Sequence, residues 1–173
     1  MKRLLLLRHA KTEPWYEGVD DRGRALTPSG HKTAIAMANL LVDRDLKPDV
    51  ALVSTARRTR ETWRHISEAF GGCEVKLLDD LYLASMTQME SVITTAEGSG
   101  TVLVVGHNPG IQDLAIRLMR DAGTRDDVAA QRVVSKFPTA ALAIFEASEG
   151  GPFIPVHFRL SDYVRPHDLG EQD

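Results

Sequence analysis

The order of the predicted elements indicates an α/β fold: a three-layer sandwich with a mostly parallel central sheet and helices on both faces. Short apolar runs alternate with segments of helical periodicity from Arg3 to Met119, which is the order that builds parallel sheets. The last third instead carries two apolar runs joined around Gly150 and Gly151, which predicts a C-terminal hairpin. A chain of 173 residues fits a single domain over residues 1–173.

Four short apolar segments predict the parallel strands, because runs of this length bounded by polar residues are typical of strands buried on both faces. They are Arg3–Leu7, Asp49–Val53, Glu74–Leu78 and Thr101–Val105. The hairpin strands are predicted at Ala140–Phe145 and Phe153–Leu160.

The first two helices are predicted from their end signals. Thr27 as N-cap and Pro28 as first helical residue begin a helix that runs to about Asp45. Ser54 and Thr55 are expected to cap a second helix, which runs to about Phe70 and is stopped by two glycines.

Two further helices are predicted, one before and one after the strand at Thr101–Val105 in the sequence. A helix over Ser85–Glu97 begins with a capping box between Ser85 and Gln88. Another begins with Asn108 as cap and Pro109 as first residue.

Three polar segments are not predicted as strand or helix. Residues 10–27 are expected to form a long loop, and loops of this length in a compact domain often carry function. Residues 121–136 have no clear pattern, and the tail from Arg165 is expected to fray.

Composition excludes several classes of protein. The net charge is −3 and no basic face with interleaved aromatic residues is present, so no nucleic-acid partner is expected. Cys73 is the only cysteine, which excludes disulfide frameworks and cysteine-based zinc sites. No segment reaches membrane-spanning length, and the apolar run that ends at Arg8 is too short for a signal peptide. We therefore expect a cytoplasmic protein without a membrane partner.

Charged and imidazole side chains follow three of the predicted strands. Arg8 and His9 follow the first strand, Arg58 lies shortly after the second, and His107 follows the strand at 101–105. In an open α/β sheet these strand ends share the edge at which ligands bind. A guanidinium can hold a phosphate through two parallel hydrogen bonds, and a neutral imidazole can act as a nucleophile or base.

These residues fall in four sequence blocks that occur in family order over residues 4–114. The blocks are Leu7–Ala10, Asp21–Gly30, Ser54–Thr62 and Val105–Gly110. Together they resemble the histidine phosphatase superfamily, and within it the small phosphohistidine phosphatases of the SixA type. Ala10 replaces the glycine of many members, as is common in the SixA-like group; Thr55 replaces a proline and Glu61 a glutamine.

The resemblance implies a phosphoglycerate mutase-like fold and a set of roles. His9 would be the nucleophile that becomes phosphohistidine, while Arg8, Arg58 and His107 would hold the phosphoryl oxygens. Arg24, from the loop that borders the pocket, would bind substrate. No metal or cofactor is implied. Cations suit this chemistry because negative charge on the phosphoryl oxygens must be stabilised, and they also lower the pKa of a neighbouring imidazole.

The remaining basic residues are expected outside the site. Arg57, Arg58 and Arg60 crowd the start of the second helix, where the helix dipole disfavours cations, so at least one of them should be functional. The family block selects Arg58, and Arg57 and Arg60 are expected to lie in solvent. Four histidines match no block and are expected to be structural or on the surface: His31, His65, His157 and His167.

No motif identifies a general acid. Five carboxylates are conceivable, namely Glu13, Asp20, Asp21, Asp79 and Asp80. A phosphohistidine substrate reduces the need for an acid, because its leaving imidazole has a reference pKa of about 6.5. The chain also leaves no length for large insertions over the pocket, and an open site suits a phosphorylated side chain of another protein.

The sequence therefore predicts a metal-independent phosphatase that acts through phospho-His9, with protein phosphohistidine as substrate. One alternative is a broad phosphomonoesterase for small phosphate esters, and another is a non-catalytic phosphate-binding module. A metallohydrolase using the same histidines is a third, although no zinc-like His-x-x-x-His spacing is present. The sequence carries no signal for the oligomeric state.

Overall fold

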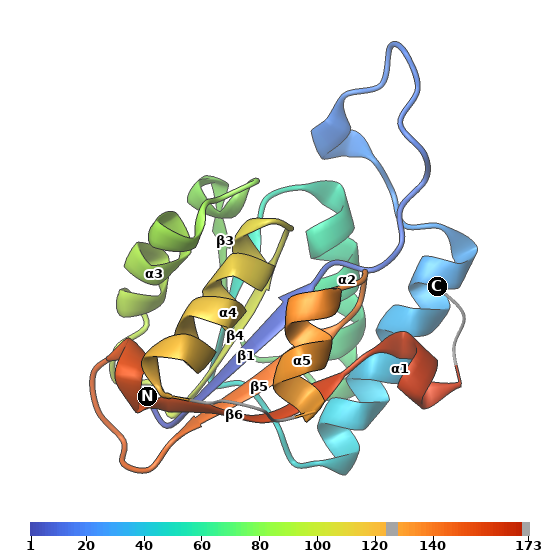
Figure 1. Ribbon diagram of the computed structural model, residues 1–173. Helices are drawn as coiled ribbons and strands as arrows, with labels where there is room; N and C mark the ends of the chain where they lie inside the picture. Colours follow the sequence, from blue (N-terminus) through green and yellow to red (C-terminus); the bar gives the residue numbers. More distant parts are fainter. Residues whose placement is uncertain (124–127, 171–173) are drawn as a thin grey trace.

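The computed structural model describes residues 1–123 and 128–170, and one six-stranded sheet lies at its centre (Figure 1). The strands are β1 (Arg3–Arg8), β2 (Val50–Ser54), β3 (Glu74–Leu78), β4 (Thr101–Gly106), β5 (Leu142–Ala147) and β6 (Phe158–Val164). Their order across the sheet is β3-β2-β4-β1-β5-β6. The β1–β4, β2–β4 and β2–β3 pairs are parallel, whereas β5 pairs antiparallel with β1 and with β6. The predicted parallel sheet with a C-terminal hairpin is confirmed.

Helices cover both faces of this sheet. They are α1 (Pro28–Asp43), α2 (Arg57–Ala69), α3 (Met86–Thr94), α4 (Gly110–Asp121) and α5 (Val128–Ser135). Helices α1 and α2 lie on one face, and α3, α4 and α5 lie on the other (Figure 1). Successive strand residues point to opposite faces, so Leu5 and Leu7 of β1 join the core beneath α1 and α2 while Leu4 and Leu6 join the other core. The three-layer sandwich is thus built on apolar runs buried on both sides.

The end signals of α1 and α3 act as predicted. The Thr27 hydroxyl accepts a hydrogen bond from the backbone N–H of Gly30 at 2.9 Å, and Pro28 is the first helical residue. The capping box between Ser85 and Gln88 is present, although α3 ends at Thr94, before the predicted Glu97.

The predicted caps of α2 are wrong. Ser54 is the last residue of β2, and its hydroxyl contacts His107. The Thr55 hydroxyl instead donates to the carboxylate of Asp79 at 2.5 Å. Because both hydroxyls are engaged in contacts distant in sequence, α2 begins at Arg57 after Ala56, without a side-chain cap.

The predicted start of α4 is also wrong. The helix begins at Gly110, and Asn108 does not cap it: its Oδ1 accepts no hydrogen bond from a described residue, while its Nδ2 donates to the carbonyl of Phe137 at 3.1 Å. A Cβ on Gly110 would lie 1.9 Å from the carbonyl oxygen of Ala84. Glycine at this position therefore permits the close approach of α4 to the segment before α3.

The last elements differ from the prediction in their bounds. Strand β6 begins at Phe158 and not at Phe153, because Pro155 opens a 3₁₀ turn over Pro155–His157 and proline has no N–H for a strand ladder. The expected fraying from Arg165 is wrong for residues 165–170, which contain the 3₁₀ turn Pro166–Leu169 with Pro166 buried. Helix α5 lies within residues 121–136, of which 124–127 are outside the described residues.

The long loop of residues 10–27 projects from the body beside the C-terminal end of the parallel strands (Figure 1). It carries a 3₁₀ turn over Asp21–Gly23 and an isolated bridge between Thr12 and Leu26. Within the described residues, no helix combines the length and apolar character needed to cross a membrane.

Candidate active site

The register of the sheet brings two histidines together. Arg8 of β1 is paired with Gly106 of β4, so His9 and His107 follow neighbouring strands at the same level. Their ring centroids are 5.2 Å apart. The proximity of two histidines so distant in sequence therefore follows from the parallel pairing of β1 with β4.

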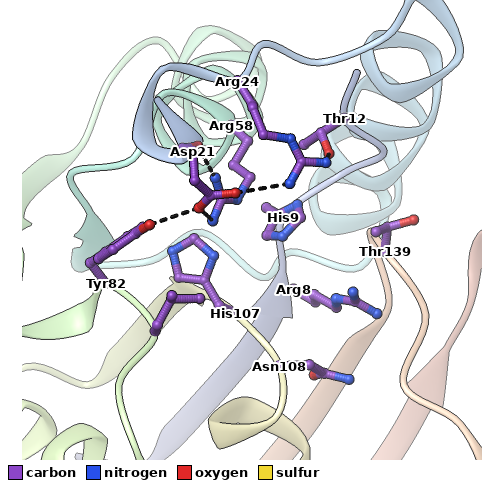
Figure 2. Close-up of a pocket in the computed structure, with 11 residues that line it drawn as sticks. Arg8, His9, Thr12, Asp21, Arg24, Arg58, Tyr82, His107, Asn108 and Thr139 are labelled. Carbon is purple, nitrogen blue, oxygen red and sulfur yellow. Dashed lines mark hydrogen bonds and ion pairs between the residues drawn. The ribbon is translucent and has the colours of Figure 1, made fainter. Parts of the chain in front are cut away.

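Around these rings lies a pocket of about 400 Å³ at the C-terminal ends of the parallel strands (Figure 2). Its lining residues are Arg8, His9, Thr12, Asp21, Arg24, Arg58, Tyr82, Leu83, His107, Asn108 and Thr139. All five residues that the sequence selected for the site are among them: Arg8, His9, Arg24, Arg58 and His107.

His9 is held in one tautomer. Its Nδ1 lies 2.8 Å from the carbonyl oxygen of Ala10, which can only accept, so Nδ1 carries the proton and Nε2 holds a lone pair. Burial lowers the pKa of His9 to about 3, and the charges of His107, Arg58 and Arg8 add to this effect against the opposing hydrogen bond to Ala10. The imidazole is consequently neutral and able to act as a nucleophile at neutral pH.

His107 is oriented by the end of β2. Its Nε2 lies 2.8 Å from the hydroxyl of Ser54, and that hydroxyl oxygen also accepts the backbone N–H of Ala56 at 3.4 Å. The described residues offer the Ser54 hydroxyl proton no acceptor other than Nε2, so the hydroxyl donates to Nε2 and the proton of a neutral ring lies on Nδ1. Nδ1 is buried without a hydrogen-bond partner among the described residues. Burial, with the charge of Arg58, lowers the pKa of His107 to about 3.

Three donors converge on the carboxylate of Asp21 (Figure 2). Arg58 Nη2 and the Tyr82 hydroxyl donate to Oδ2 at 2.9 and 2.7 Å, and Arg24 Nη1 donates to Oδ1 at 2.9 Å. Burial alone would raise the pKa of Asp21, but hydrogen bonds from Tyr82, Arg24 and Arg58 outweigh it and hold the pKa well below its usual range. Asp21 is therefore ionised and fixes two guanidinium groups at the rim of the pocket.

Arg24 and Arg8 are anchored on opposite sides of the pocket. Arg24 Nη2 donates to the Thr12 hydroxyl and to the carbonyl of Glu13, both at 2.8 Å, which ties the long loop to the site. Arg8 Nη1 donates to the carbonyl of Phe137 at 2.9 Å. Each of these cations thus has a defined position at the edge of the pocket.

The neighbouring arginines and the other histidines lie outside the pocket lining. The Arg57 side chain is 52% exposed and pairs with Glu61, whereas the Arg58 side chain is only 4% exposed. His31 and His65 contact each other at 2.9 Å between Nδ1 and Nε2.

Of the five carboxylates considered as general acids, Asp21 alone lines the pocket. Asp79 is engaged by Arg22 and Thr55 outside it, and their hydrogen bonds lower its pKa. In the described part of the chain, no group of three or more His, Cys, Asp and Glu side chains is arranged to hold a metal ion.

Sequence reasoning missed the positioning contacts of Ser54, Asp21 and Tyr82. Ser54 and Asp21 belong to the sequence blocks that resemble the family, and this membership was the one signal that pointed to them. Their partners, His107 and Arg58, lie 53 and 37 residues away in sequence. Tyr82 lies in no block, and its contact with Asp21 spans 61 residues. No local pattern carries such information.

The fold and the pocket place the chain among α/β proteins with a cationic site at the carboxyl ends of parallel strands. The sequence profile of the histidine phosphatase superfamily (branch 1) matches residues 4–97, and the chain belongs to this family. The uncharacterized protein Rv1276c of Mycobacterium tuberculosis is 33% identical over 143 residues, which cover 82% of this chain and 87% of that protein.

Solved structures agree with this assignment. A protein assigned as the phosphohistidine phosphatase SixA of Agrobacterium tumefaciens superposes with a TM-score of 0.82 at 31% identity, over 95% of this chain and 98% of that chain. A protein assigned likewise from Nakamurella multipartitia gives a TM-score of 0.81 at 26% identity, over 95% of this chain and 96% of that chain. Family and neighbours support a phosphatase of the hydrolase class with the phosphoglycerate mutase-like fold.

Proposed function

We propose that this protein is a metal-independent phosphatase that removes the phosphoryl group from phosphohistidine in other proteins, through a phosphohistidine intermediate on His9. The lone pair of His9 Nε2 attacks phosphorus, and the bond from phosphorus to the substrate nitrogen breaks. The electron pair of that bond stays with the substrate imidazole. Water then attacks phospho-His9, which releases inorganic phosphate and restores the free imidazole.

The observation that carries the choice of substrate is the state of Asp21. It is the one carboxylate in the pocket lining of the described residues, and its pKa is held well below the usual range, so it has no proton to donate. An alkoxide leaving group needs a general acid. A substrate imidazole protonated on its other nitrogen leaves as neutral imidazole, so phosphohistidine places the least demand on this pocket.

The arginines and His107 have complementary roles in the proposed reaction. Arg8 and Arg58 would stabilise the charge that develops on the equatorial oxygens of the transferred group. His107 would donate a hydrogen bond from Nδ1 to a phosphoryl oxygen. This nitrogen is buried without a partner among the described residues, and a bound phosphoryl group would supply the missing acceptor. Arg24 would bind substrate at the rim, beside the loop that it anchors.

The likeness to proteins assigned as SixA supports the same substrate, since one of them shares 31% identity over nearly the whole length of both chains. The phosphorylated partner would present its imidazole at the mouth of the pocket, where the exposed side chain of Leu83 forms part of the lining.

The test compares substrates at equal phosphate content in the presence of EDTA. One is an isolated histidine phosphotransfer domain phosphorylated on its histidine, and the others are p-nitrophenyl phosphate and sugar phosphates. We expect kcat/KM for the phosphoprotein to exceed the values for the esters by at least about tenfold, a difference of about 1.4 kcal/mol. A higher kcat/KM for the esters would indicate a broad phosphomonoesterase. No turnover of any substrate would indicate a phosphate-binding module.

A further inference from the structure

Residues 13–20 form the tip of the long loop, which stands clear of the rest of the molecule beside the phosphoryl pocket (Figure 1). The tip turns back on itself through a hydrogen bond from the N–H of Val19 to the carbonyl of Tyr16 at 3.2 Å. Its two aromatic side chains are exposed, Trp15 by 61% and Tyr16 by 63%, whereas the chain's other tryptophan, Trp63, is only 6% exposed. Two adjacent aromatic side chains exposed on a projecting loop require an explanation, because large apolar groups in water are unfavourable.

The stem below this tip is fixed to the body of the protein. The N–H of Glu13 donates to the carbonyl of Ala25 at 3.0 Å, and the guanidinium of Arg24 donates to the carbonyl of Glu13. After the tip, Arg22 forms an ion pair with Asp79 at 2.7 Å. Three pocket-lining residues flank the tip in sequence: Thr12, Asp21 and Arg24. The tip is thus attached at a defined place beside the mouth of the pocket.

The tip is acidic. It carries Glu13, Glu17 and Asp20, and no lysine or arginine. The carboxylates of Glu13 and Glu17 make no hydrogen bond or ion pair with a described residue, and that of Asp20 accepts only the backbone N–H of Arg22 at 3.2 Å. The adjacent pocket is instead lined by three arginines. A ligand that covers both regions must therefore carry positive charge close to its phosphoryl group.

A small phosphate ester fills the pocket and leaves the tip without a partner, and the carboxylates of the tip repel such a dianion. A protein surface can cover both regions at once. Its cationic side chains can pair with the carboxylates and lie over the faces of Trp15 and Tyr16, and tryptophan and tyrosine often dominate the binding energy of protein interfaces. An anionic membrane surface would be repelled by the same carboxylates.

We propose that the tip, residues 13–20, is a docking site for the substrate protein, and that it binds a surface with lysine or arginine and apolar side chains next to the phosphohistidine. The inference rests on the proposed function, in which the substrate is a protein, and it adds the surface that recognises that protein. The tip acts in binding alone, so the reaction at His9 does not depend on it.

The first arm removes the aromatic side chains. In Trp15→Ala/Tyr16→Ala we expect kcat/KM for a phosphorylated histidine phosphotransfer domain to fall at least about tenfold, through KM. Turnover of the free amino acid phosphohistidine should be unchanged, because this substrate reaches only the pocket. The matched control is Ile154→Ala/Val156→Ala, which removes two exposed apolar side chains. They precede β6, whose first residue pairs with Ala147 at the end of the sheet opposite the pocket.

The second arm tests the charge of the partner with peptides of about 15 residues, which span about 50 Å when extended. Each peptide has one phosphohistidine and, on one side of it, either lysines or glutamates. At low ionic strength we expect kcat/KM to be about fivefold higher for the lysine peptides, and this preference to shrink in high salt. It should also fall in Glu17→Lys. It should persist in the control Glu97→Lys, because the exposed Glu97 lies beside Lys2, before the start of β1.

An unchanged kcat/KM for the phosphoprotein in Trp15→Ala/Tyr16→Ala, or equal turnover of lysine and glutamate peptides, would overturn the docking site and leave the proposed function intact. An equal loss with free phosphohistidine would show that the tip supports the pocket itself and would also overturn the proposal. Light scattering tests a second copy as the occupant: a wild-type dimer that dissociates in this variant would contradict a substrate protein there. Absence of phosphohistidine turnover by the wild-type protein would overturn the proposed function itself.

Discussion

Arg58 is held against Asp21 by two hydrogen bonds, from Nη1 to the backbone carbonyl at 2.6 Å and from Nη2 to the carboxylate at 2.9 Å. The Arg58 side chain is only 4% exposed. A buried guanidinium at the start of a helix is unfavourable without a partner. The 3₁₀ turn at Asp21–Gly23 therefore determines where the guanidinium of Arg58, in the first turn of α2, lies in the pocket.

Replacement of this carboxylate should separate catalysis from binding. In Asp21→Asn, Arg58 and Arg24 lose their common anion, so we expect kcat to fall about tenfold, or about 1.4 kcal/mol. Inhibition by inorganic phosphate should not weaken, because a negative charge has left the pocket. Steady-state kinetics with phosphate as competitive inhibitor measure both effects. An unchanged kcat would show that α2 alone positions Arg58.

Adjacent arginines of α2 provide a matched pair. Arg58→Ala removes a charge-assisted contact to the phosphoryl group, and we expect kcat/KM to fall by about 2–4 kcal/mol in activation free energy. Arg57→Ala removes only an exposed pair with Glu61 and should change kcat/KM by less than about threefold. A loss with Arg57→Ala equal to that with Arg58→Ala would contradict the assignment.

Ser54 should act through His107. Its hydroxyl fixes the tautomer that leaves a proton on Nδ1 of His107, so Ser54→Ala should lower kcat about tenfold. Ser54→Thr, which keeps the hydroxyl, should retain more activity than Ser54→Ala. The Cε1–H resonance of His107 should shift in Ser54→Ala if the tautomer changes. Full activity together with an unshifted resonance would exclude this positioning role.

Both pocket histidines should remain neutral across the physiological range. Burial lowers the pKa of His9 and of His107 to about 3, so each ring binds a proton only when the pH approaches that value. Their Cε1–H resonances, assigned by comparison with His9→Ala and His107→Ala, should therefore not move between about pH 8 and about pH 5. A titration midpoint near the ordinary value of 6.5 for either ring would contradict the electrostatic account.

Much of the fold was predictable because it follows from local patterns. The apolar run at Arg3–Arg8 is buried on both faces, and Thr27 and Pro28 begin α1 through interactions within one turn. The cap assigned to Ser54 was wrong because its hydroxyl contacts His107, which is distant in sequence. Asn108 Oδ1 accepts no hydrogen bond from a described residue, and the orientation of this side chain is set by donation from Nδ2 to the Phe137 carbonyl. Local capping preference is weaker than such tertiary contacts.

The same distinction applies to the site. The shared edge of the sheet, which the sequence predicts, accounts for the placement of His9 beside His107. The partners of Asp21 could not be predicted, because Tyr82 meets it only after the segment following β3 has folded against the long loop.

The central claim is that the phosphoryl group passes through His9. The most direct measurement is a rapid quench of the enzyme with ³²P-labelled phosphohistidine substrate in the presence of EDTA, followed by mapping of the labelled peptide. The account predicts an acid-labile, alkali-stable label on His9, and loss of both label and turnover in His9→Ala. Substantial turnover by His9→Ala, or a label on another residue, would contradict it.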